Sequence, residues 1–171
     1  GLGQIENLSK YSEPDIAVIT NIGTAHIGLL GSKKNITYAK CEISKFLNPK
    51  GVVIIPANDL LLEETLREYW KGRVIKVELL NIENQKESFK KDDVNLRGFY
   101  DPSQKTILIE EYTFQISFEG FHNASNFLFA YAVAKELGVD FASFNKFDFM
   151  STGGRNKIFK SAKTTIYLSL I

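Results

Sequence analysis

A short apolar run at residues 16–19 leads directly into a polar segment with a glycine, residues 20–26. An apolar run followed by a loop is typical of a strand buried inside a sheet. In open α/β sheets, the loops at the carboxyl ends of the strands form the ligand sites. The feature therefore predicts an α/β fold with a binding loop at this edge of the sheet.

Helices and strands alternate through the first half of the chain. We expect helices at residues 4–11, 35–47 and 58–70, and strands at residues 15–20, 52–55 and 74–77. Asn35 is a suitable N-cap for the second helix. This alternation predicts a doubly wound, mostly parallel sheet with helices on both faces.

The second half changes pattern after a polar surface loop at residues 83–93. Residues 95–100, 106–109 and 113–118 alternate apolar and polar side chains, as half-buried antiparallel strands do, and predict a small antiparallel β insertion. A helix at residues 124–137 ends at Gly138, a short helix follows within residues 139–150, and a last strand covers residues 164–171.

Composition narrows the class of protein. The 171 residues suit one domain, and 44% hydrophobic with 24% charged residues is typical of a globular protein. A net charge of +1 gives no reason to expect nucleic acid as a partner. No apolar stretch approaches the roughly 20 residues that span a bilayer. A single cysteine, Cys41, excludes an internal disulfide and suits a cytoplasmic location.

Two residues are candidates for metal binding or catalysis. His26 ends the polar loop, where an imidazole can bind a metal ion or phosphate, or simply bond to the backbone. Lys40, fourteen residues later, can contact phosphate, be modified, or lie on an exposed helix surface. Glu42 is equally open, and Cys41 is more simply a small core residue.

A second polar cluster lies at the start of the helix expected at residues 124–137. His122, Asn123 and Asn126 would meet free N–H groups and the positive end of the helix dipole. Amide side chains can read the edge of a nucleobase, although an ordinary helix cap explains them equally well. Further on, Arg155 follows a glycine pair and can contact phosphate or remain solvated.

Five of these segments together resemble the central, ATP-binding domain of the Mur ligases. They read PDIAVITNIGTAH (14–26), LGS (30–32), AKCE (39–42), GFHNASN (120–126) and GR (154–155), in the family's order and spacing. The resemblance is strongest to the branch, in its cyanobacterial form, that adds D-alanyl-D-alanine to UDP-N-acetylmuramoyl-tripeptide in peptidoglycan synthesis. In this family ATP phosphorylates a carboxylate, and an incoming amine attacks the acyl phosphate.

The resemblance implies a role for each candidate. His26 and a carbamylated Lys40 would be ligands of Mg²⁺, since carbamylation turns a cation into an anionic oxygen donor. Asn21, His122, Asn123 and Asn126 would bind ATP, the last two on its adenine side. Arg155 would contact the terminal phosphate and, with Lys40, take part in catalysis.

The resemblance also has departures. The family's phosphate loop and magnesium-binding glutamate would precede residue 1, and no GxxxxGK[ST] motif occurs in the sequence. The strand expected at residues 164–171 lacks the acidic residues of the family's ribose-contacting stretch. We therefore expect residues 1–171 to be an incomplete central domain, without the N-terminal UDP-sugar domain or the C-terminal domain, and inactive by themselves.

Two alternatives stay open at this point. The chain could belong to another ligase of the superfamily, of the folylpolyglutamate or cyanophycin synthetase type. It could also be a non-catalytic remnant of a ligase.

Overall fold

The computed structural model describes all residues except 1, 24–26, 85–92, 144–156, 161–164 and 169–171. Its main sheet has six strands in chain order: β1 (Ile16–Val18), β2 (Val52–Pro56), β3 (Arg73–Asn81), β4 (Leu96–Asp101), β5 (Thr106–Ile109) and β6 (Tyr112–Gln115). The pairs from β1 to β4 are parallel, and those from β4 to β6 are antiparallel. The predicted α/β class, with an antiparallel insertion on a mostly parallel sheet, is confirmed.

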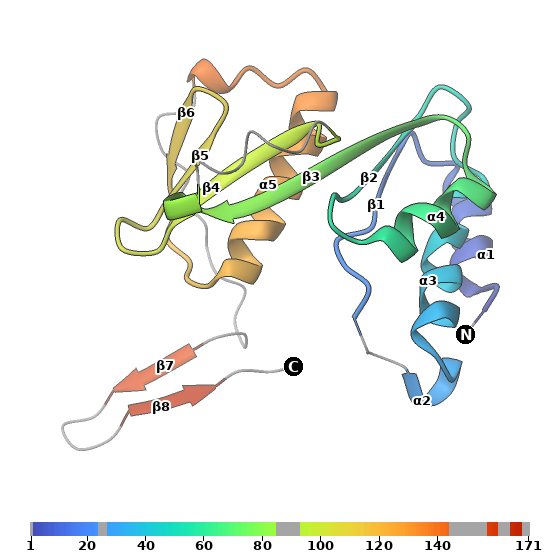
Figure 1. The fold of residues 1–171 in the computed structure, drawn as a ribbon, viewed down its shortest axis with the longest axis horizontal. Helices are drawn as coiled ribbons and strands as arrows, with labels where there is room; N and C mark the ends of the chain where they lie inside the picture. The colour runs from blue at the N-terminus through green and yellow to red at the C-terminus, as the bar shows by residue number, and fades with distance from the viewer. Residues whose placement is uncertain (1, 24–26, 85–92, 144–156, 161–164, 169–171) are drawn as a thin grey trace.

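The helices are α1 (Gln4–Ser12), α2 (Ile27–Leu30), α3 (Lys33–Cys41), α4 (Leu60–Tyr69) and α5 (Phe121–Glu136), with short 3₁₀ helices η1 (Glu42–Ser44) and η3 (Phe141–Ser143). Helix α5 packs on one face of the sheet and α3 and α4 on the other, while α1 packs against η1 and α3, and α2 against α3. Figure 1 shows α1, α3 and α4 gathered together, and α5 apart from them. The chain therefore covers the two faces with different helices, as predicted.

Strand β2 shows how the sheet divides the core. Ile54 packs in a cluster with α5 residues such as Leu128, whereas Val53 and Ile55 pack in a second cluster with α3 and α4 residues such as Leu62. Successive side chains of a strand point to opposite faces, so a central strand with apolar residues throughout must be covered on both. The continuous apolar sequence of β2 is thereby explained.

Several predicted element bounds were wrong. The helix expected at residues 35–47 begins at Lys33 and gives way to η1 after Cys41. Its N-cap is Ser32, whose hydroxyl accepts a hydrogen bond from the Asn35 N–H at 3.1 Å. Asn35 instead donates its side-chain amide to the Leu30 carbonyl at 2.7 Å. Ser32, three residues earlier, therefore supplies the hydrogen-bond acceptor at the amino end of this helix.

The later helix and the last strand also differ from expectation. Helix α5 begins at Phe121 rather than residue 124, because Gly120 takes a φ of 94° at the N-cap and lets the chain turn in early. Gly138, with a φ of 75°, follows the helix as predicted. The last strand, β8 (Thr165–Leu168), pairs with an unpredicted β7 (Lys157–Lys160) in a separate two-stranded sheet.

Candidate functional site

A cavity of about 550 Å³ opens at the carboxyl ends of β1 and β2. Its polar lining residues come from the loops after these strands and from two helices, α3 and α5: Thr20, Asn21, Lys33, Asn58, Asp59 and Ser125. The volume lies within the roughly 300–1,000 Å³ of typical small-molecule sites. The binding loop predicted from the apolar run at residues 16–19 therefore does line a pocket.

The backbone fixes the two loops that form this cavity. The Ile19 N–H donates to the Ile54 carbonyl at 3.0 Å, so the loop after β1 leaves the sheet beside β2. After β2, the Asp59 carboxylate accepts from the Leu62 N–H at 3.0 Å and starts α4 at the cavity wall. Parallel strands end at one edge, so both loops meet there.

Lys40 is attached directly to the loop after β1. Its ammonium donates to the Asn21 carbonyl oxygen at 2.6 Å, from the last turn of α3. Burial lowers the pKa of Lys40 from its ordinary value. Two predicted site residues are thus in contact, but an unmodified ammonium has only donors and cannot itself coordinate a cation.

The second predicted cluster occupies the first turns of α5. The Asn123 amide donates to the Glu119 carbonyl at 2.7 Å, just before the helix, and the N-cap, Gly120, has no side-chain cap bond among the described residues, so an ordinary side-chain cap does not account for this cluster. Asn126 and His122 lie one helical turn apart, with Asn126 Nδ2 3.5 Å from His122 Nε2, and both are exposed. Ser125, in the same turns of α5, lines the cavity together with Asn21, whereas His122, Asn123 and Asn126 are not among its lining residues.

Two predicted site residues, His26 and Arg155, lie outside the described residues. Within the described part of the chain, no group of three or more His, Cys, Asp or Glu side chains could hold a metal ion. The magnesium assignment therefore stays a prediction, and it depends on a modified Lys40.

Four polar residues that line the cavity were not among the candidate site residues: Lys33, Asn58, Asp59 and Ser125. The pair Asn58 and Asp59 follows the buried strand β2 just as the predicted loop follows β1, so the same rule could have found it. Ser125 stood inside a quoted motif. Nothing in the sequence pattern around Lys33 pointed to the cavity.

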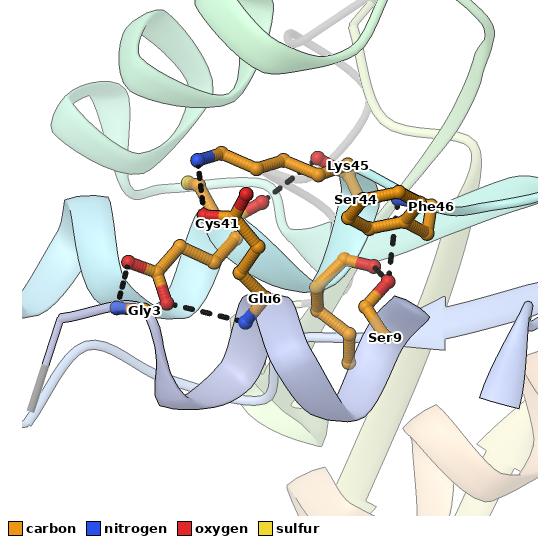
Figure 2. Close-up of polar contacts among 9 residues, drawn as sticks. Gly3, Glu6, Ser9, Cys41, Ser44, Lys45 and Phe46 are labelled. Carbon is orange, nitrogen blue, oxygen red and sulfur yellow. Dashed lines mark hydrogen bonds and ion pairs between the residues drawn. The ribbon is translucent and has the colours of Figure 1, made fainter. Parts of the chain in front are cut away.

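Glu42 and Cys41 both prove to be buried. The Glu42 carboxylate accepts from the backbone N–H groups of Gly3, at 2.7 Å, and Glu6, at 3.3 Å. Figure 2 shows these two nitrogens at the amino end of α1, each with a dashed line to the carboxylate. Burial, reinforced by the charges of nearby acidic residues, raises the pKa of the Cys41 thiol to about 12, so Cys41 is a core residue rather than a nucleophile.

Comparison with known proteins points to one family. A family model, the Mur ligase middle domain, matches residues 1–134. The UDP-N-acetylmuramoyl-tripeptide–D-alanyl-D-alanine ligase of Synechocystis sp. is 36% identical over 140 residues, which cover 82% of this chain and 28% of the relative. The Bacillus subtilis ligase of the same name is 32% identical over 141 residues, covering 80% and 28%. The chain thus spans about 28% of the length of these curated relatives.

Solved structures share the fold. MurF from Acinetobacter baumannii superimposes with a TM-score of 0.75 at 23% identity, covering 98% of this chain and 36% of that one. MurF ligase from Thermotoga maritima, solved in complex with ADP, gives a TM-score of 0.70 at 20% identity, covering 98% and 38%. These proteins therefore share the fold of this chain.

Proposed function

The chain belongs to the Mur ligase family through its middle domain, and on this premise we propose that it is part of the ATP-binding region of an amide-bond ligase. The ligase would add D-alanyl-D-alanine to UDP-N-acetylmuramoyl-tripeptide through an acyl phosphate. The reaction would belong to peptidoglycan synthesis in the cytoplasm. The two relatives described above support this substrate assignment through their names.

One observation carries the proposal. A single cavity is lined both by the loop after β1, with Asn21, and by Ser125 at the start of α5. These two segments contain residues to which the family resemblance gives roles in binding ATP: Asn21 in the first, and His122, Asn123 and Asn126 in the second. Because both segments reach a pocket of suitable volume, a role in nucleotide binding is better supported than a role in core packing.

Within this proposal, the amino end of α5 takes the adenine side of ATP. The Asn126 amide offers a donor and an acceptor to a base edge, and His122 stands beside it. The Asn123 amide nitrogen already donates to the Glu119 carbonyl, so Asn123 would act mainly by holding the segment before α5 in place. Arg155 would contact the terminal phosphate.

The proposal also gives Lys40 and His26 to Mg²⁺. Carbon dioxide adds to the neutral amine of lysine and releases a proton, leaving an anionic carbamate. Burial favours this step because it lowers the pKa of Lys40 and so raises the fraction of neutral amine. The carbamate oxygens would suit a hard cation, and the remaining N–H could still donate to Asn21.

The nucleotide assignment is tested on the 171 residues as they stand. In ¹⁵N-labelled chain, titration with Mg²⁺ and ADP should shift the amide signals of Asn21, Ser125 and Asn126, whereas Mg²⁺ with ribose should not. NMR detects even millimolar affinity, so unchanged spectra at saturating ADP would favour a remnant without nucleotide binding. We expect no ligation of D-alanyl-D-alanine by these residues alone, and such activity would refute that expectation.

The substrate assignment needs a longer protein. We would insert residues 1–134 into the Synechocystis relative in place of its matching middle-domain segment. The chimera would be assayed with ATP, UDP-N-acetylmuramoyl-tripeptide and D-alanyl-D-alanine. Retained ligation supports the proposal, and ligation of a different amine would overturn it. In an active chimera, Lys40→Ala should abolish activity, and short carboxylates should restore part of it. Loss without rescue would leave Lys40 as a phosphate contact or structural residue.

A further inference from the structure

Glu42 contacts the amino end of α1, a long-range contact that its local sequence does not predict. It follows Lys40 by two residues and is 5% exposed. Its two carboxylate oxygens accept separately from Gly3 N, at 2.7 Å, and Glu6 N, at 3.3 Å. These N–H groups belong to the amino end of α1, 39 and 36 residues away along the chain.

The amino end of α1 depends on this carboxylate. Gly3 occupies the N-cap with a φ of 81° and has no side chain to offer, and α1 has no side-chain cap bond of its own among the described residues. Helix N-termini favour negative charge, while a buried carboxylate is costly unless donors reach it. Each group therefore satisfies the other, and removing the charge should release the first turn of α1.

The rest of α1 is held by other groups. Lys45 pairs with Glu6 at 2.6 Å. The Ser9 hydroxyl donates to the Ile43 carbonyl at 2.7 Å and accepts from the Phe46 N–H at 3.3 Å. Figure 2 shows the contact between Ser9 and Phe46 farther along α1 than the positions of Gly3 and Glu6. Because these contacts remain, a variant of Glu42 should keep α1 docked and change mainly its first turn.

Residues 40–42 join three parts of the molecule. Lys40 holds the loop after β1 through the Asn21 carbonyl, and Glu42 holds α1. Between them, the side chain of Cys41 is fully buried and acts as a fixed point. Loss of the hydrogen bonds from α1 to Glu42 should therefore rotate residues 40–42 about Cys41. This rotation would change the distance between the Lys40 ammonium and the Asn21 carbonyl.

We propose that Glu42 is a positioning residue, which couples the amino end of α1 to the placement of Lys40 in the candidate site. The proposal rests on the proposed function for the meaning of that site, but its primary readout needs no nucleotide. If ADP leaves the wild-type spectrum unchanged, the proposed function fails while the coupling can still be measured.

The test compares Glu42→Gln with Glu6→Gln in ¹⁵N-labelled chain. Glu6→Gln is the matched control because it breaks the Lys45 pair on the same helix turn but leaves both N–H groups that Glu42 binds. We expect Glu42→Gln to speed amide exchange at Gly3 and Glu6 and to shift the amide signals of residues 21–23 more than the control does. Shifts confined to α1 would make Glu42 only a helix cap and overturn the proposal.

A second background shows whether the effect passes through Lys40. In Lys40→Met chain, Glu42→Gln should cause no further shift at residues 21–23, because the link to Asn21 is already absent. An undiminished shift would also overturn the proposal. If Glu42→Gln does not fold, Glu42→Asp keeps the charge but withdraws the carboxylate by one methylene, and the same comparisons apply with a smaller expected shift.

Discussion

The Lys40 ammonium lies 2.6 Å from the Asn21 carbonyl oxygen and so ties the last turn of α3 to the loop after β1. The sequence had nominated these two residues for different tasks, one in catalysis and one in cofactor binding. Their contact shows that one hydrogen bond links the two residues. The loop geometry is therefore sensitive to any change in the charge of Lys40.

Replacing Lys40 by Met should lower the free energy of unfolding. Hydrogen bonds to charged groups contribute about 1.5–3 kcal/mol, and partial exposure here reduces the expected loss to about 1 kcal/mol. Urea denaturation followed by circular dichroism measures this loss. Lys50→Met, in an exposed turn, is the control and should change stability little. Equal stabilities of the two variants would contradict the role of the Lys40 contact.

Enlarging Ser125 should block the cavity without unfolding the chain. Ser125 is partly exposed and lines the same pocket as Asn21. In Ser125→Leu we expect the apparent affinity for ADP, followed by the amide shifts at Asn21, to fall at least about tenfold. The larger side chain fills space that the ligand needs. Ala130→Leu, at an exposed position of the same helix, should bind ADP like the wild type. Equal weakening in both variants would point to a general effect on α5.

Local pattern sufficed for most of the fold and for part of the site. Buried strands such as β2 have apolar residues throughout, and alternation marked β4 to β6, so the sheet could be predicted. The loop after β1 followed from the same strand rule. The resemblance to the family, now confirmed, added an order of motifs that no single motif could supply.

The parts that escaped prediction depend on distant or competing contacts. Glu42 caps a helix 36 to 39 residues away, and no local pattern signals such a pairing. Asn35 looked like a cap, but Ser32 caps the helix three residues earlier and accepts from the N–H of Asn35 itself. Lys33 lines the cavity because the first residue of α3 lies beside the loops after β1 and β2. Tertiary placement, rather than propensity, decided each of these.

Adding a methyl group at Gly51 should destabilise the fold strongly. A Cβ there would lie 2.5 Å from the Asp15 carbonyl oxygen and 2.9 Å from that of Asn48, both backbone atoms that cannot easily move. Overpacking costs about 1–3 kcal/mol in typical cores, and Gly51→Ala should reach the upper part of this range. Gly28→Ala, with nothing within 4 Å of the added Cβ, is the matched control. Thermal melts should show a lower Tm for Gly51→Ala alone.

The Cys41 thiol should resist alkylation in the folded chain. Burial raises the pKa of this thiol to about 12, and nearby acidic residues reinforce the shift, so almost no thiolate exists near pH 8. Mass spectrometry after treatment with iodoacetamide should show an unmodified native chain and rapid modification in urea. Fast modification without denaturant would mean that the core around α3 opens readily.

Stability should also fall in mild acid because of Glu110, in the turn between β5 and β6. Its carboxylate accepts hydrogen bonds from the Tyr131 hydroxyl, at 2.9 Å, and from the Lys135 ammonium, both on α5. Burial opposes its ionisation, but the bonds from Lys135 and Tyr131 outweigh it and lower the pKa of Glu110. Its ionised form therefore stabilises the fold above the unfolded-state pKa of about 4.3, and this contribution is lost as the pH falls through the lower folded-state value.

The measurement is urea unfolding between about pH 5 and pH 3, the window in which this contribution disappears. Wild type should lose more free energy of unfolding across that window than Glu110→Gln, which cannot ionise at this position. Glu111→Gln, which removes the neighbouring exposed carboxyl group, is the comparison variant. If Glu110→Gln followed the wild-type curve, the tie between the β5–β6 turn and α5 would not depend on the charge of Glu110.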